Sequence, residues 1–169
     1  EDVKGRIGNA EISDVKIENF DDNSKPLIYS YTIKVPNYAQ KAGKRIFLQP
    51  GFFEYGSSPA FSSATRTHDI SFPFPWSEND EIDIQLPKGF ELDVADAPAD
   101  LFDPLRIGSL KITMGIVRAT NVLKYSRKFH FGGGGAILFP ASAYNPLKNL
   151  FDGFHKADTH AVSIRQAAK

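Results

Sequence analysis

The stretch LKITMGIVRATNVLKYSRKFHF, residues 110–131, decides the fold of this chain. Apolar side chains alternate with polar ones on both sides of Ala119-Thr120-Asn121, a period that is typical of strands with one buried face. The two arms therefore predict a long antiparallel hairpin. The apolar positions are Leu110, Ile112, Met114 and Ile116 in the first arm and Leu123, Tyr125, Phe129 and Phe131 in the second.

The same alternation predicts further strands upstream. Residues 27–35 form one such segment, and residues 82–86 and 90–94 form two more on either side of Pro87-Lys88-Gly89. We expect a hairpin or a sharp corner at that tripeptide, with Gly89 available for a positive φ. Weaker strands are expected at residues 15–20, 45–48, 69–72 and 161–165.

Helical spacing occurs near the end of the chain, where Leu147, Leu150, Phe151 and Phe154 form an apolar stripe. Asn145 is a plausible N-cap, with Pro146 at the first helical position. The sequence predicts a short helix over residues 146–156. Because the stripe is narrow, we expect the helix to dock on a sheet edge or end.

Many strands, frequent turn signals and one short helix favour an all-β fold, an antiparallel β-sandwich that is immunoglobulin-like or related. The length of 169 residues, with 41% hydrophobic and 24% charged content, is enough for a single domain over residues 1–169. Twenty basic and twenty acidic residues give zero net charge, so nucleic acid is not an expected partner. No apolar stretch is long enough to predict a membrane span.

The sequence predicts no catalytic, cofactor-binding or metal site. It contains no cysteine, which excludes disulfides, thiolate metal sites and a cysteine nucleophile. No serine stands in a Gly-x-Ser-x-Gly elbow. The run Gly132 to Gly135 leads into apolar residues and lacks the Lys-Ser/Thr pair of a phosphate loop, so it predicts a flexible bend or bulge. The four histidines do not share ligand spacing; they are His68, His130, His155 and His160.

Carboxylates and aromatic rings leave alternatives open. The segments 21–24 and 77–80 are interpreted as turns, and no spacing selects a pair of carboxylates for glycoside hydrolysis. Phe52, Phe53, Tyr55 and Trp76 lie in a proline-rich stretch. These rings either plug one end of the sandwich, which we favour, or bind a glycan or a peptide from exposed loops.

The order of four segments resembles the C-terminal domain of bacterial transglutaminase-like proteins. The segments are YTIKVPNYAQKAGKRIFLQP (31–50), TRTHDISFPF (65–74), EIDIQLPKGFELD (81–93) and YNPLKNLFDGFHKADTHAVSIRQ (144–166). In that family a β-rich domain and a transglutaminase-like core precede a last domain of unknown function. The most specific elements are the Leu86-Pro87-x-Gly89 turn and the final helix and strand. The four-glycine run departs from the family's pattern and leaves the geometry after the long hairpin in doubt.

The resemblance implies a non-catalytic accessory domain that packs on the upstream core of the same chain or presents it, in a periplasmic or secreted protein. The family's core uses a Cys, His and Asp triad, so no catalytic residue transfers to this cysteine-free segment. This interpretation predicts no deep polar pocket and one large apolar surface patch. The alternative, a carbohydrate- or peptide-binding module, requires Trp76 and its neighbours to be coplanar and exposed. A free-standing hydrolase is the least favoured hypothesis.

Overall fold

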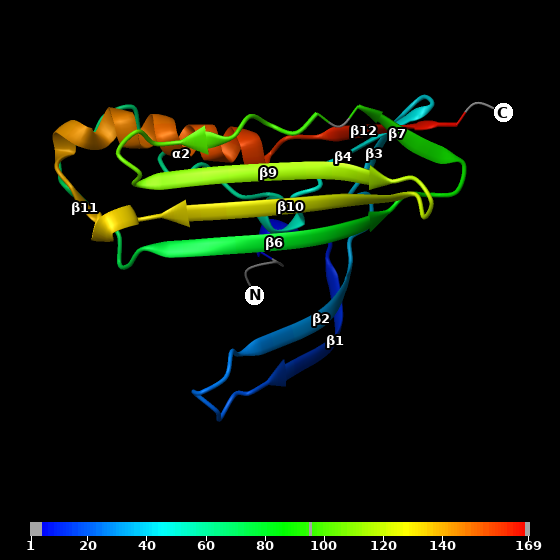
Figure 1. Ribbon diagram of the computed structural model, residues 1–169, viewed down its shortest axis with the longest axis horizontal. Helices are drawn as coiled ribbons and strands as arrows, with labels where there is room; N and C mark the ends of the chain where they lie inside the picture. Colours follow the sequence, from blue (N-terminus) through cyan, green and yellow to red (C-terminus); the bar gives the residue numbers. More distant parts are fainter. Residues whose placement is uncertain (1–4, 95, 168–169) are drawn as a thin grey trace. The chain divides into compact units, whose positions relative to one another are not determined.

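Antiparallel strands make up most of the regular secondary structure in the computed structural model, which describes residues 5–94 and 96–167 (Figure 1). The predicted all-β antiparallel sandwich with a short C-terminal helix is confirmed. The strands are β1 (Glu11–Glu18), β2 (Ile28–Lys34), β3 (Gln40–Ala42), β4 (Arg45–Leu48), β5 (Ile70–Ser71), β6 (Trp76–Gln85), β7 (Phe90–Val94), β8 (Leu101–Phe102), β9 (Gly108–Val117), β10 (Val122–Phe131), β11 (Leu138–Phe139) and β12 (Val162–Gln166).

The described chain divides into two compact units, Glu1–Tyr38 and Ala39–Lys169. The first contains the two-stranded sheet β1-β2. The second contains two four-stranded sheets, in the orders β6-β10-β9-β8 and β3-β4-β12-β7, and the small pair β11-β5. That residues 1–169 act as a single domain stays a prediction.

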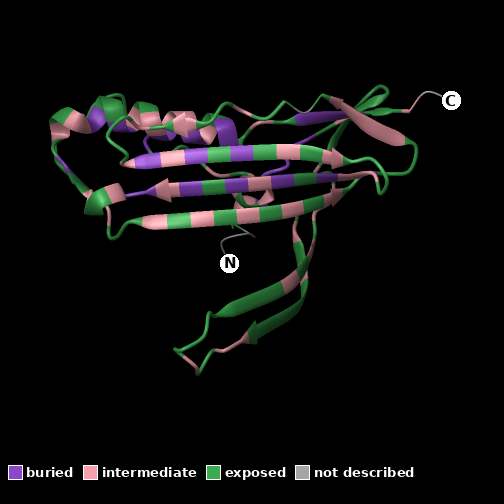
Figure 2. Ribbon diagram, viewed as in Figure 1, coloured by how far each residue is buried: buried purple, intermediate pink, exposed green. Residues whose placement is uncertain are grey.

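The long hairpin predicted from residues 110–131 is confirmed as β9 and β10, whose register runs from Val117 opposite Val122 to Gly108 opposite Phe131. Its alternating burial is visible as stripes along the strands in Figure 2. The segments before and after Pro87 form a corner, because β6 pairs with β10 whereas β7 pairs with β12 of the other sheet. Gly89 has a φ of 79°, the positive value that this turn requires.

The helix α2 spans Tyr144–Asp158 and is longer than predicted. The N-cap assignment was wrong: Ala143 occupies that position without a side-chain cap, and Asn145 lies inside the first turn. A 3-10 helix, η3 (Ala141–Ala143), leads directly into α2 and supplies the turn that a capping side chain would otherwise stabilise.

The helix was expected to dock on a sheet edge or end; its apolar stripe covers the inner face of the long sheet, over the half that contains Phe129 and Phe131. The Phe154 ring lies 5.3 Å from that of Phe129, and Phe151 lies 4.9 Å from Phe131, both on the interior strand β10. After three residues the chain continues into β12, so the sheet β3-β4-β12-β7 extends the layer that α2 begins (Figure 1).

The core of the second unit is unusually aromatic around α2. Phe131 is fully buried and contacts Phe72, Trp76, Phe139 and Phe151, with ring centroids 4.7 to 6.1 Å apart. The predicted bend at the glycine run is confirmed by a short 3-10 segment, η2 (Gly133–Gly135). Gly132 has a φ of 87°, and a Cβ there would lie 2.5 Å from the Cβ of Pro75, so both the backbone and the packing require glycine.

The first unit is a twisted ribbon with one polar and one apolar face. Ile17 opposes Tyr29, and Ile12 opposes Ile33, on the apolar face, whereas the neighbouring pair Lys16 and Ser30 lies on the polar face. Asp14 has a φ of 53° at the irregularity between Ser13 and Lys16, where a bulge shifts the register.

No helix in the described parts of the chain combines the length and apolar character needed to cross a bilayer.

Candidate functional site

Arg127 is a buried cation at the centre of the second unit. It belongs to β10, where the period of two points it inward with Tyr125 and Phe129, and its side chain is only 3% exposed. A guanidinium removed from water requires hydrogen-bonding partners of opposite charge. Its carbon Cζ also lies 5.1 Å from the centre of the Phe129 ring, a cation–π distance.

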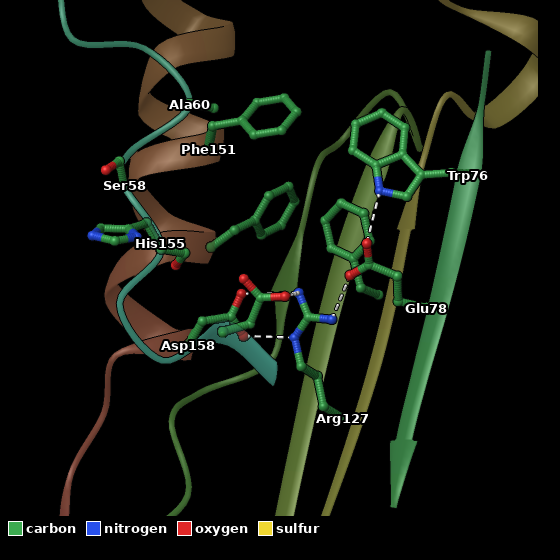
Figure 3. Close-up of a pocket in the computed structure, with 12 residues that line it drawn as sticks. Ser58, Ala60, Trp76, Glu78, Arg127, Phe151, His155 and Asp158 are labelled. Carbon is green, nitrogen blue, oxygen red and sulfur yellow. Dashed lines mark hydrogen bonds and ion pairs between the residues drawn. The ribbon is translucent and has the colours of Figure 1, made fainter. Parts of the chain in front are cut away.

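Carboxylates from three separate elements surround Arg127 (Figure 3). Its Nε and Nη2 donate to the two oxygens of Asp158, at 2.7 and 2.9 Å, in a bidentate arrangement. Its Nη1 donates to Glu78 Oε2 at 2.7 Å and lies 3.5 Å from Asp80 Oδ2. Glu54 Oε1 lies 3.8 Å from Nη2. The arginine therefore joins the sheet, α2 and the segment η1 (Phe52–Glu54).

Asp158 is held at the C-terminal end of α2, where the helix dipole disfavours a negative charge. Arg127 compensates that charge. Gln49 Nε2 donates to the Asp158 carbonyl at 2.9 Å, and Thr159 Oγ1 donates to the His155 carbonyl at 2.8 Å. The side chains of Arg127, Gln49 and Thr159 thus bind the carboxylate and the backbone carbonyl groups at the C-terminal end of the helix.

The charges around the arginine shift the pKa values of their neighbours. Burial by itself lowers the pKa of Arg127, but the hydrogen bond and charge of Asp158, together with Glu78 and Glu54, raise it above its usual value. Burial raises the pKa of Asp80; Arg127 opposes this effect, while Glu78 and Asp158 add to it. The raised pKa of Asp80 therefore reflects burial first, with the like charges of Glu78 and Asp158 as smaller causes.

A cavity of about 150 Å³ opens beside these groups. One wall is aromatic and consists of Trp76, Phe129, Phe151 and Phe154. The charged part of the lining consists of Glu54, Glu78, Asp158 and the buried arginine, and Ser57, Ser58, Ala60 and His155 also line the cavity. Trp76 Nε1 donates to Glu78 Oε1 at 3.2 Å, which fixes the indole against the acidic wall (Figure 3).

Buried Tyr125, two residues before the arginine, adds a polar group to the same region. Its hydroxyl is buried and has no hydrogen-bond partner among the described residues. Burial raises the pKa of Tyr125 above its usual value, and the charge of Asp158 adds to the effect. The hydroxyl therefore stays neutral at any physiological pH.

A second hollow, of about 430 Å³, is lined by Asp103, Arg106, Ser109 and His130 among others. His130 Nδ1 and Ser77 Oγ lie 2.9 Å apart on exposed positions of neighbouring strands. Within the described residues no third side chain hydrogen-bonds to His130, so the pair lacks the orienting group of a catalytic triad. We interpret it as a cross-strand polar pair.

The rings of the aromatic stretch differ in how they are packed. Trp76 belongs to the core cluster and is partly buried, as the packing interpretation predicts. Phe52 and Phe53 meet edge to face at an interplanar angle of 75°, and Phe53 is 46% exposed. Tyr55 is half-buried. These rings do not form the coplanar exposed platform that the sugar-binding hypothesis requires.

The turn expected at residues 77–80 was wrong, because these residues form the first half of β6. Glu78 and Asp80 occupy the positions whose side chains face the interior, in phase with Trp76 and Ile82. Sequence reasoning also missed Arg127. The signal was present: Arg127 is the one charged residue at an inward position of β10, between Tyr125 and Phe129.

Among the described residues, no group of three or more histidine, aspartate and glutamate side chains is arranged to hold a metal ion. The four histidines lie on different elements: His68 precedes β5, His130 is on β10, His155 is in the last turn of α2 and His160 precedes β12.

Comparison with protein families gives a match over residues 44–164, to the model of a domain of unknown function with a solved structure, DUF3858. The matched region begins after the β1-β2 ribbon and includes α2 and most of β12. No curated protein and no solved structure shows significant similarity to the chain.

Proposed function

The chain belongs to the DUF3858 family of domains of unknown function, and we propose that it is a non-catalytic accessory domain of a bacterial transglutaminase-like protein. In this proposal the domain packs on the transglutaminase-like core that precedes it in the same chain, in the periplasm or outside the cell. The resemblance of the sequence segments supports the transglutaminase-like core as the partner and the periplasm or the outside of the cell as the location. The ribbon β1-β2 supports packing on that core.

The observation that carries this proposal is the apolar face of the ribbon. Its sequence alternates like that of a strand with one buried side, yet Ile17 is 52% exposed, Tyr29 is 55% exposed and Leu27 is 64% exposed. An isolated two-stranded ribbon is marginally stable in water unless a further layer covers its apolar face. The face therefore fits a surface that a partner covers.

The polar face of the same ribbon is suited to face the solvent while a partner covers the apolar face. Lys16 and Glu18 form an ion pair at 2.8 Å, and Lys34 and Glu11 form another at 3.5 Å, all with highly exposed side chains. Exposed ion pairs of this kind keep one face in water and contribute little to stability. The ribbon precedes the region matched by the family model, on the side where the resemblance expects the core.

The chemistry of the cavity favours binding over catalysis. Each donor group of Arg127 is bound to a carboxylate, and Glu78 accepts from both Arg127 and Trp76. Arg127 and Glu78 are therefore parts of an ion-pair network that holds the fold together. This supports the non-catalytic role.

Calorimetry between this chain and the separately expressed transglutaminase-like core of its parent protein tests the proposal. We expect saturable binding with a negative heat-capacity change, the sign of apolar burial. Replacing the cross-strand pair Ile17 and Tyr29 by serine should weaken the affinity about tenfold or more, since each buried side chain contributes about 1.5–3 kcal/mol.

The matched control is the adjacent pair on the polar face, Lys16→Ser with Ser30→Ala, which should leave the affinity unchanged. Circular dichroism must show that both double variants keep the fold. Absence of binding, or equal binding by the two double variants, would contradict the docking role of this face.

A further inference from the structure

We propose that the cavity beside Arg127 binds the cationic end of a basic side chain, an alkylammonium or guanidinium group carried by a peptide. The proposal is independent of the docking role of the ribbon. It rests on the sign of the charges that face the cavity, on its aromatic wall and on its size.

The arginine excludes an anion instead of attracting one. Its Nε and Nη2 are bound to Asp158 and its Nη1 to Glu78, at 2.7 to 2.9 Å, so its short hydrogen bonds are directed at protein carboxylates. An entering anion would have to displace one of these partners and would also meet the carboxylate of Glu54, 3.8 Å from the arginine. The ligand that fits this arrangement carries a positive charge.

The lining is left with an excess of negative charge. Three carboxylates, Glu54, Glu78 and Asp158, line the cavity with one guanidinium, so carboxylates outnumber the guanidinium by two. Asp80 stands behind them, 3.5 Å from Arg127, and adds a further carboxylate. The side chain of Glu78 is 41% exposed and that of Glu54 is 25% exposed, so the acidic wall reaches the solvent.

The aromatic wall favours the same ligand. The faces of Trp76 and of the neighbouring phenylalanines attract cations and exclude water. Among tryptophan, tyrosine and phenylalanine, tryptophan attracts cations most strongly. A cavity of this type, with carboxylates and aromatic rings together, is the usual solution for binding organic cations. Its volume of about 150 Å³ matches the end of a lysine or arginine side chain and is too small for a sugar ring with its neighbours.

The single tryptophan of the chain makes the test direct, because Trp76 lines the cavity and its emission reports on it. The intact chain is titrated with N-acetyl-lysine amide, N-acetyl-arginine amide and the uncharged N-acetyl-norleucine amide, followed by fluorescence and by calorimetry. We expect the lysine or the arginine probe to bind saturably, with a Kd of about 1 mM, and to bind more weakly as salt is raised. The norleucine probe should not bind.

Glu54→Gln is the informative variant, because it removes one charge from the wall and leaves the Arg127–Asp158 pair in place. We expect its affinity for the basic probe to fall at least about threefold. Asp83→Asn is the matched control: Asp83 lies on the outer side of β6, is 64% exposed and is paired with Lys124. Its affinity should equal that of the original chain, and thermal unfolding should show that both variants are folded.

The proposal is overturned if neither basic probe binds, if the norleucine probe binds as well as they do, or if Glu54→Gln binds like the original chain. None of these results bears on the ribbon, since the residues that line the cavity all lie between Glu54 and Asp158. Conversely, a failure of the chain to bind the transglutaminase-like core would not contradict the proposal that the cavity binds a cation.

Discussion

Replacing Arg127 by methionine should destabilise the second unit strongly. The arginine is 3% exposed and its principal partner Asp158 is 6% exposed, so both charges are removed from water. Methionine fills most of the volume but leaves Asp158 buried without its cation. Breaking a buried pair from one side costs about 3–5 kcal/mol, a large part of the roughly 5–15 kcal/mol that stabilises a typical domain.

The assay is denaturation by urea, followed by far-ultraviolet circular dichroism and by Trp76 fluorescence. For a chain of this size, a loss of about 4 kcal/mol also corresponds to a fall in Tm of about 10 °C. Lys124→Met is the control on the same strand. Its ion pair with Asp83 is more than half exposed on both sides, so its loss should cost less than about 1 kcal/mol.

A second substitution separates charge from packing. If the cost of Arg127→Met comes from the uncompensated carboxylate, adding Asp158→Leu should recover at least about half of it, because no unpaired charge then remains at the end of α2. The reasoning is refuted if Arg127→Met costs less than about 1 kcal/mol, or if the double variant is no more stable than the single one.

Three further variants test other parts of the site. Tyr125→Phe should increase the free energy of unfolding by about 1 kcal/mol in urea denaturation, because it removes a buried hydroxyl that has no partner; a loss of stability would contradict this assignment. Gly132→Ala should decrease the free energy of unfolding by about 2 kcal/mol or more, because φ is positive there and the added Cβ would meet Pro75. Thermal unfolding measures this effect, and an unchanged Tm would show that the bend is not constrained. Asp80→Asn should stabilise the protein at pH 7: folding raises the Asp80 pKa, so the folded state binds this proton more tightly and the ionised carboxylate costs stability above that pKa. The difference from the original chain should close below about pH 3.8, where Asp80 is protonated in both states, and a difference that stays constant from pH 3 to 7 would exclude this cause.

Most of the long strands were predictable from their alternating pattern. Alternation located β9 and β10 and the corner at Gly89, because side chains on a pleated strand point alternately to the two faces. The short strands β3 and β8 were not predicted, since two or three residues carry no period. The start of α2 was misplaced because η3 replaces the capping side chain that sequence reasoning looks for.

The candidate site was harder to predict because it breaks the rule that locates strands. Glu78 and Asp80 face inward on β6, where an apolar residue is expected, and this made the segment resemble a turn. Arg127 interrupts the apolar series of β10 in the same way. The inward carboxylates on β6 are explained by the inward arginine on β10, and the arginine by the carboxylates, although these residues lie far apart in the sequence. Charged residues that fall in phase with a buried face on two strands are a signal that they meet.

The ten-residue strand β6 has a further consequence, because it is the edge of its four-stranded sheet. An edge of this length presents unpaired backbone groups on which another chain can add a strand. Its sequence, WSENDEIDIQ, carries four carboxylates, so two copies brought edge to edge repel each other at neutral pH. Two of these four carboxylates, Glu78 and Asp80, also surround Arg127. The acidic edge thus protects the domain from ordered aggregation, and this protection ends in acid, where the carboxylates lose their charge.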